Sequence, residues 1–233
     1  MKKLESIPIK LESEAIQKRL RLKDKERVKS ILERVAPIIS GQALYHLAYI
    51  EAKTADRVKI SGIEFKSRVL RKNLNQVERV FPFVITIGPG LEKEIEKTSN
   101  ILDQFSLDAI GNIALGRARQ YLEDHIKNTY RIEKISFMSP GSLKDWPLEE
   151  QKGLFSIIPG IEEAIGVQLT KSLLMIPKKS VSGIFFQTEV SFYNCQLCPR
   201  KKCQGRKAAY SQELAKEYGV LDEEIQGHGF MAP

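Results

Sequence analysis

Residues 80–87 constrain the fold most, because this stretch is almost continuously apolar. A short apolar run bounded by turn residues predicts a β-strand, and its lack of polar alternation predicts that both of its faces are buried. Gly88-Pro89-Gly90 follows and predicts a turn into a helix. That helix carries acidic residues from Glu92 onward, so we interpret the glycine loop as a plain turn, not as an anion site. The chain therefore contains a sheet with at least one strand covered on both sides.

The remaining pattern predicts an α+β fold. Residues 43–50 and 132–138 read as strands, residues 12–40 carry apolar residues at helical spacing, and residues 101–129 form the longest helical stretch. Strands and helices alternate without the regular rhythm of βαβ units, which favours a mixed architecture. Shorter strands are expected at residues 58–60, 63–65, 167–169, 173–176 and 181–186.

We expect three parts along the 233 residues. Residues 1–40 form an N-terminal helical segment, residues 41–190 an α+β core, and residues 191–233 a cysteine-containing C-terminal tail. This length fits one large domain or one domain with appendages.

The amino-acid composition limits the kinds of partner and the location that we expect for this protein. The net charge of +8 suits an acidic partner or ligand. The basic run at residues 18–29 is either a contact face or a solvated helix side, and no nucleic-acid-binding motif accompanies it, so no nucleic-acid partner is expected. No apolar run has the length that a bilayer requires, and residues 1–6 lack a signal-peptide core, so we expect no membrane partner and a cytoplasmic protein.

The segment from residue 139 to residue 151 predicts a strand-to-helix loop that can hold a ligand. Its Ser-Pro-Gly start is a turn signal, Asp145 offers a carboxylate to cap a helix, and Pro147 suits a first helical position. Such a loop can present bare amides and carbonyls to a small polar ligand, although it can also be an ordinary connection. The single tryptophan can cover a flat ligand or pack on the core. The candidate ligand-binding residues are Ser139, Pro140, Gly141, Ser142, Lys144 and Trp146.

All three cysteines lie in one C-x2-C-x4-C segment, at Cys195, Cys198 and Cys203. The two-residue gap lets two thiolates reach one metal ion or cluster iron, and a reducing cytosol disfavours a disulfide. Three thiolates leave one coordination position for His228, a water, a ligand or a partner's side chain. The segment predicts an iron–sulfur cluster or a zinc site, and the alternative is free thiols on a basic tail.

Four short motifs follow one another between residues 44 and 186. They are TIGPGL at residues 86–91, LDAIG at 107–111, SPG with WPLEEQ at 139–151, and the segment from LT to MIPKKSVSG at 169–183. In this order they resemble the activation domain of cobalamin-dependent methionine synthase, and more closely its free-standing homologues. The resemblance implies a curved, largely antiparallel sheet with helices packed around it. It also implies that the loop at residues 139–142 binds S-adenosylmethionine and presents its methyl group to a corrinoid held by a partner. Free-standing homologues often carry similar terminal cysteines.

Three positions depart from the family's pattern. Phe137 stands where the family has an arginine that pairs with the carboxylate of S-adenosylmethionine, Ser142 where it has a tyrosine, and Lys171 where it usually has an acidic residue. Lys134 or Lys144 can replace the positive charge of that arginine, but a lysine does not reproduce its bidentate fork.

The function that these features imply is an accessory one. The protein would assist reductive reactivation of a corrinoid enzyme, with methionine synthase as the expected partner, by positioning S-adenosylmethionine for methyl transfer to the corrinoid. Catalysis would be positioning, and no side chain need act as acid, base or nucleophile. The alternative is a non-catalytic module that binds a corrinoid protein, carries a metal or iron–sulfur centre in the cysteine tail, and does not bind S-adenosylmethionine.

Overall fold

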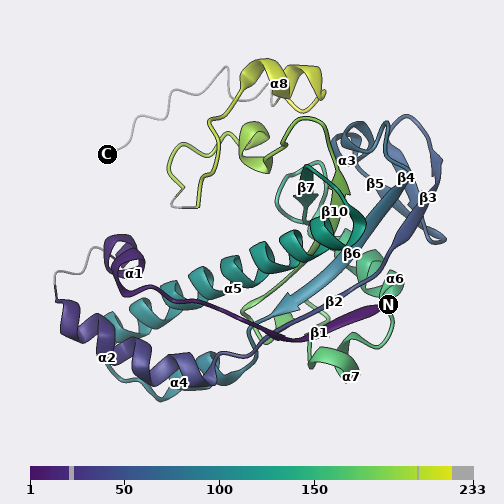
Figure 1. Cartoon of the computed structure of the whole chain (residues 1–233). Coiled ribbons are helices and arrows are strands. Elements are labelled where there is room, and N and C mark those ends of the chain that lie inside the picture. Colours follow the sequence, from purple (N-terminus) through teal and green to yellow (C-terminus); the bar gives the residue numbers. More distant parts are fainter. Residues whose placement is uncertain (21–23, 204, 222–233) are drawn as a thin grey trace.

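The computed structural model describes residues 1–20, 24–203 and 205–221. Eight strands of these residues form one sheet, namely β1 (Lys2–Ile7), β2 (Gly41–Tyr45), β3 (Ala48–Lys53), β4 (Arg57–Ile60), β5 (Ile63–Lys66), β6 (Arg79–Thr86), β7 (Ile135–Met138) and β10 (Ser180–Gln187). The order is β1-β2-β6-β3-β4-β5, and β10 pairs with β6 and β7 (Figure 1). Every pairing is antiparallel, so the predicted α+β class is confirmed. A separate two-stranded ladder joins β8 (Gln168–Leu169) to β9 (Met175–Ile176).

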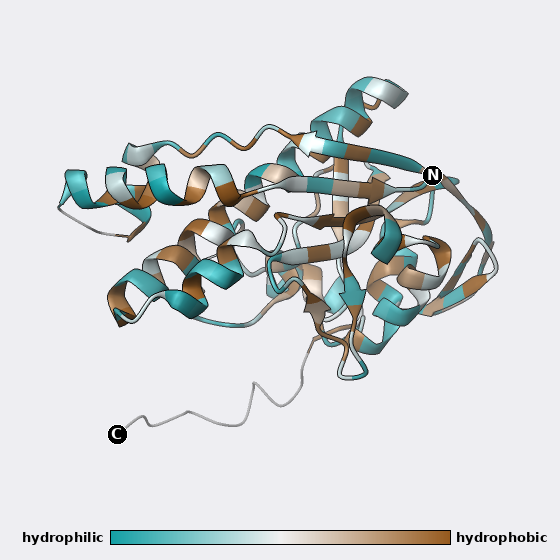
Figure 2. Ribbon diagram, turned by 90° about the horizontal axis from the view of Figure 1, so that it is seen from below, coloured by the Kyte–Doolittle hydropathy of each residue, from teal (hydrophilic) through white to brown (hydrophobic). Residues whose placement is uncertain are grey.

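Helices bury two hydrophobic clusters on the sheet. The first cluster contains side chains of α1 (Ser13–Leu20), α2 (Lys25–Val35), α4 (Gly90–Lys97) and α5 (Ile101–Tyr130). The second contains side chains of α3 (Arg68–Asn73), α6 (Gln151–Ile157), α7 (Ile161–Ile165) and α8 (Gln212–Glu217). Figure 2 shows the helices with mixed brown and teal surfaces, as expected of amphipathic helices packed on a core. Three short 3₁₀ turns complete the set: η1 (Ala36–Ile38), η2 (Leu148–Glu150) and η3 (Asn194–Leu197).

Strand β6 is buried on both faces, as its sequence predicted. Phe81, Phe83 and Ile85 belong to the cluster under α5, whereas Val80 and Val84 belong to the cluster under α6. This alternation is the two-residue period of a strand with an apolar layer on each side. β6 is therefore the element that joins the two halves of the core.

Pro82 occupies the middle of this central strand, where a proline is usually excluded because it lacks an N–H. On one edge of β6 the partner changes at this point, since β2 ends at Tyr45 and β3 begins at Ala48. The Pro82 carbonyl still accepts the amide of His46 at 3.0 Å. The gap between two partner strands therefore removes the need for a donor at residue 82.

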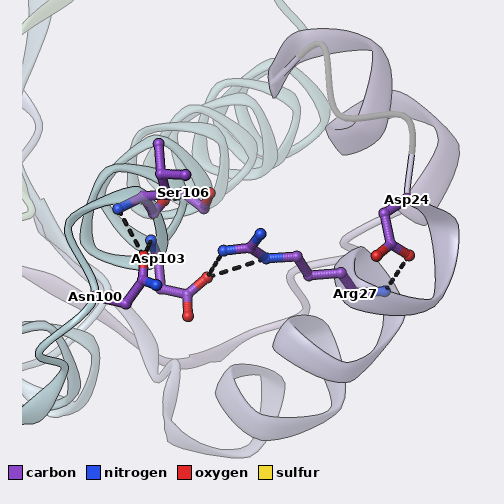
Figure 3. A network of polar contacts seen from close by, with 6 residues as sticks. Asp24, Arg27, Asn100, Asp103 and Ser106 are labelled. Atoms are coloured by element: carbon purple, nitrogen blue, oxygen red, sulfur yellow. Dashed lines mark hydrogen bonds and ion pairs between the residues drawn. The ribbon is translucent and has the colours of Figure 1, made fainter.

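The first 40 residues are joined to the sheet and the core. Strand β1 pairs with β2, and the guanidinium of Arg27 in α2 donates to the carboxylate of Asp103 in α5 at 2.7 Å. Figure 3 shows this ion pair between two capped helix starts. Asp24 caps α2 by accepting the Arg27 amide, and Asn100 caps α5. Among the described residues, no helix has the length and apolar character needed to cross a membrane.

Candidate functional site

The candidate ligand loop begins where β7 ends. Gly141 has a φ of +78°, which glycine adopts without steric cost. Its amide donates to the Trp146 carbonyl at 2.8 Å, the Ser142 amide donates to the Ser139 carbonyl at 3.2 Å, and the Trp146 amide donates to the Leu143 carbonyl at 3.1 Å. These three amides are therefore bonded within the turn and are not available to a ligand, which favours the second of the two expected roles, an ordinary connection, for this part of the loop backbone. The surfaces it leaves for a ligand are its side chains and its outer backbone edge.

Asp145 caps a helix, but not the one that follows it in sequence. Its carboxylate accepts the hydroxyl of Ser67 at 2.6 Å, the amide of Val69 at 2.9 Å and the guanidinium of Arg68 at 3.1 Å. These donors belong to the start of α3. The loop is thus fixed to α3, and the predicted cap of the following helix is wrong because Asp145 reaches across the fold.

Trp146 lies in the core. Its side chain is 0 % exposed, and it packs edge-to-face against Phe65 with the ring centres 6.1 Å apart. The structure therefore favours packing on the core, the second of the two roles expected for this residue, over contact with a flat ligand. The candidate residues Ser139, Gly141 and Ser142 are brought together with it by the turn.

A cavity of about 670 Å³ opens beside this loop. A volume of this size fits a small-molecule ligand. Residues 141–145, including the candidate Lys144, form one wall. Three further sides come from the start of α3, from residues 197–200 and from residues 219–221. The lining combines positive side chains, apolar side chains and one carboxylate. They are Arg68, Lys144 and Arg200, then Val69, Leu143 and Leu197, and finally Asp145, which is paired with Arg68.

The C-terminal segment packs on the core and forms part of the wall of this cavity. Phe192 and Leu197 are buried, and Phe192 stacks on Tyr218 with the ring centres 5.8 Å apart. The Asn194 side-chain amide donates to the Ser142 hydroxyl at 2.7 Å, so the segment also contacts the loop directly. Sequence reasoning missed Asn194, because no local pattern ties residue 194 to residue 142.

Several buried polar atoms around the loop have no hydrogen-bond partner among the described residues. They are the Ser139 hydroxyl, the Trp146 indole nitrogen and the Asn194 side-chain oxygen. A buried polar group without a partner is costly, so such atoms point to a water or a ligand at the site.

The three cysteines lie in one loop whose backbone is held by a single arginine. The guanidinium of Arg206 donates to the carbonyls of Cys195, Cys198, Ala208 and Arg200. The Lys207 amide donates to the Cys195 sulfur at 3.4 Å. Cys195 and Cys198 are half-buried and Cys203 is exposed.

The described residues contain no group of three or more His, Cys, Asp or Glu side chains placed to hold a metal ion. The candidate fourth ligand, His228, lies outside the described residues, as does the end of the predicted tail from residue 222 onward. The structure describes all three cysteines and does not bring them together as one ligand group, so the metal site stays a prediction.

Phe137, at the position where the resemblance implies an arginine, packs among aromatic rings. Its ring centre lies 5.7 Å from that of Phe185 and 6.5 Å from that of Phe83. The guanidinium of Arg119, from α5, lies 4.3 Å from the ring centre. The Lys134 ammonium, one expected substitute for the missing charge, donates to the Glu189 carbonyl at 3.2 Å. Arg119 had no signal in the sequence beyond its place on a helix.

Comparisons with known proteins give a family match for part of the chain and a shared fold. Residues 121–207 match the family described as "Vitamin B12 dependent methionine synthase, activation domain". The match extends beyond residue 186 and includes all three cysteines. No curated protein matches the chain. Thirteen chains of solved structures match, among them the "Crystal Structure of the MetH Reactivation Domain bound to AdoHcy", at 13 % identity and a TM-score of 0.55. That comparison covers 79 % of this chain and 69 % of the other, and it shows a shared fold. The resemblance noted in the sequence is thereby confirmed.

Proposed function

We propose that this chain, whose residues 121–207 match the activation-domain family of vitamin B12-dependent methionine synthase, is an accessory protein for reductive reactivation of a corrinoid enzyme. The partner would be a cobalamin-dependent methionine synthase or a related corrinoid protein, reached in the cytoplasm. The corrinoid, supplied by that partner, accepts a methyl group once an external donor has reduced it. The task of the present chain is to hold S-adenosylmethionine with its methyl group toward the corrinoid.

The cavity beside the loop at residues 139–146 is the observation that carries this proposal. Its volume of about 670 Å³ and its mixed lining suit a ligand with an apolar ring system and a charged end. Val69 and Leu143 would contact the ring system. Lys144, the lysine already expected to replace the family's arginine, would stand near the carboxylate, with Arg68 beside it already paired with Asp145. The chain contributes orientation, and we assign no acid, base or nucleophile.

Calorimetric titration with S-adenosylmethionine and with AdoHcy tests this site. In Gly141→Ala the new Cβ would approach Leu148 Cδ1 to 3.0 Å at a φ of +78°, so the turn must shift. We expect the affinity to fall about tenfold or more. Gly62→Ala is the matched control, because Gly62 has a φ of +80° and open space around it, in a hairpin away from the loop. No binding to the wild-type chain, or equal losses in both variants, would contradict the proposal.

Partner binding gives a second test. The chain carries 37 Lys and Arg against 29 Asp and Glu, so an acidic face on the corrinoid protein should attract it. Pull-down with the host's methionine synthase should weaken as salt rises, since the Debye length shortens to about 3 Å at 1 M. Association that salt does not change, or tighter binding to random DNA, would count against this partner.

The cysteine loop supports a second candidate function. An amide donated to a cysteine sulfur, as Lys207 donates to Cys195, also stabilises a thiolate that ligates a metal. We propose that Cys195, Cys198 and Cys203 bind one zinc ion or one iron–sulfur cluster with an exchangeable fourth position. In the alternative function the chain is a non-catalytic module that binds a corrinoid protein, carries this centre in its tail and does not bind S-adenosylmethionine.

Elemental analysis and the ultraviolet–visible spectrum of protein purified without oxygen test this centre. Cys198→Ser should release the metal, because a hydroxyl is a poor substitute for a soft thiolate. Lys201→Ser is the matched control in the same loop, and it should retain the metal. If neither iron nor zinc accompanies the chain after anaerobic reconstitution, the cysteines are free thiols.

A further inference from the structure

A second, smaller cavity of about 170 Å³ lies between α5, β7 and the C-terminal segment. It is separate from the cavity beside the loop, and no residue lines both. Its walls carry two positive side chains, Arg119 and Lys207, and one negative side chain, Glu123. Ser136, Phe137 and Tyr193 are also in the wall.

Arg119 is buried and only partly satisfied. Its side chain is 10 % exposed, and Nη1 donates to Glu123 Oε2 at 2.9 Å. One face of its guanidinium covers the Phe137 ring at 4.3 Å. A guanidinium has five N–H donors, and among the described residues Glu123 is its one hydrogen-bond acceptor. The remaining N–H groups are therefore available to solvent or to a ligand in the cavity.

Lys207 adds a second positive charge to the same cavity. Residue 207 lines this cavity and is exposed to solvent. No described residue forms an ion pair with the Lys207 ammonium. Two cations thus face one carboxylate, which leaves an excess of one positive charge in a small space.

We propose that this cavity binds the carboxylate group of a small molecule, held by Arg119 and Lys207. A monoanion neutralises the excess of one charge. A phosphate would place up to two negative charges beside Glu123. The planar fork of a guanidinium matches the two oxygens of a carboxylate, and charge-assisted bonds of this kind are the strong ones. The Ser136 hydroxyl, which accepts the Phe192 amide at 2.9 Å, can donate its own hydrogen to the same group.

Acetate is the probe for this site. Sodium acetate is titrated into the full chain labelled with ¹⁵N-arginine, with sodium chloride at equal ionic strength as the reference. The Arg119 Nε–H resonance, assigned with Arg119→Lys, should shift and saturate with acetate alone. Lys207→Gln should weaken the acetate affinity about tenfold, because one of two charged donors is lost. This variant changes a side chain at the protein surface, so it avoids the risk that a buried Arg119 variant does not fold.

Lys201→Gln is the matched control, since Lys201 is an exposed lysine of the same loop and the change in net charge is identical. Equal effects of Lys201→Gln and Lys207→Gln would reduce the site to general charge attraction and overturn the proposal. An Arg119 resonance that acetate does not move would overturn it too, as would a tighter saturation by phosphate than by acetate.

Competition then identifies the source of the carboxylate. Displacement of acetate by S-adenosylmethionine but not by its decarboxylated form would show that the proposed ligand of the loop reaches this cavity. Acetate binding that neither form disturbs would support a free small carboxylate. The acetate titration does not depend on S-adenosylmethionine, so a failure of the proposed function would leave this result unaffected.

Discussion

Asp145 ties two segments that lie far apart in the sequence. Its carboxylate is 9 % exposed and accepts three hydrogen bonds from residues 67–69 at the start of α3. Asp145→Ala should lower the free energy of unfolding by about 2–3 kcal/mol, because buried donors lose a charged acceptor. Urea denaturation measures this loss. Asp24→Ala is the control: Asp24 caps α2 through one exposed hydrogen bond, and its loss should cost about 1 kcal/mol or less. Equal losses would mean that Asp145 acts only as an ordinary cap.

A single residue, His125, should also make the stability of the fold depend on pH. Its Nε2 lies 3.0 Å from the Tyr45 hydroxyl. Partial burial, and then the positive charge of Lys2, lower the pKa of His125 below its usual value. The unfolded chain therefore takes up a proton at a higher pH than the folded chain does. Stability should fall as the pH drops through about 6.5, the unfolded value, toward the lower folded value.

Urea denaturation at pH 7.5 and pH 5.5 measures the change in the free energy of unfolding between the two pH values. The His125→Gln variant should show a smaller change. Burial also lowers the pKa of His46. The His125→Gln variant should therefore still lose stability as the pH falls, but by a smaller amount. An equal change in the variant and in the wild-type chain would show that His125 does not contribute.

At the scale of the element, α5 offers a matched pair of glycines. A Cβ on Gly116 would meet open space, whereas a Cβ on Gly111 would approach Leu91 Cδ2 of α4 to 2.7 Å and Lys179 Cε to 3.0 Å. Gly116→Ala should raise the free energy of unfolding by about 0.5–1 kcal/mol, because alanine has the higher helix propensity. Gly111→Ala should lower it, since overpacking costs about 1–3 kcal/mol and outweighs the same gain. Thermal unfolding of the two variants should therefore move in opposite directions.

The whole molecule depends on its C-terminal segment. Phe192 and Leu197 are buried in the same cluster as Trp146, and Tyr218 donates to the Asn73 side chain at 3.2 Å. Removal of residues 191–233 should destabilise the fold by several kcal/mol, since each large buried side chain contributes about 1.5–3 kcal/mol. Removal of residues 222–233 is the control, because it keeps every contact described above. Equal unfolding temperatures for both truncations would show that the segment adds nothing to the core.

Local patterns predicted the elements, and distant contacts decided the site. Two elements were predicted closely: β6 from the apolar run at residues 80–87, and α5 from the helical spacing over residues 101–129. The periods of strands and helices repeat over a few neighbouring residues, so the local sequence contains them. The loop at residues 139–146 was also located correctly as a turn after a strand. The sequence did not predict that three amides of this loop are bonded within the turn, because residue types alone do not reveal such hydrogen bonds.

Other features had no local signal at all. Asp145 caps a helix more than 70 residues away, and Arg119 reaches Phe137 from another element. The gap that tolerates Pro82 exists only once β2 and β3 have paired with β6. The resemblance added what spacing could not, since it implied S-adenosylmethionine as the ligand of this loop.

Arg206 gives the cysteine loop a property that its sparse secondary structure would not. One guanidinium accommodates carbonyls from four points of the chain between residues 195 and 208. Fixing the backbone of a residue costs about 1–2 kcal/mol of conformational entropy, and here the folded chain has already met that cost before any guest arrives. A partner that contacts this loop therefore meets a backbone that is already ordered, so little binding free energy is lost in ordering it. The three described cysteine side chains are not placed as one metal-ligand group, so a metal would require these side chains, and not the backbone that Arg206 holds, to move.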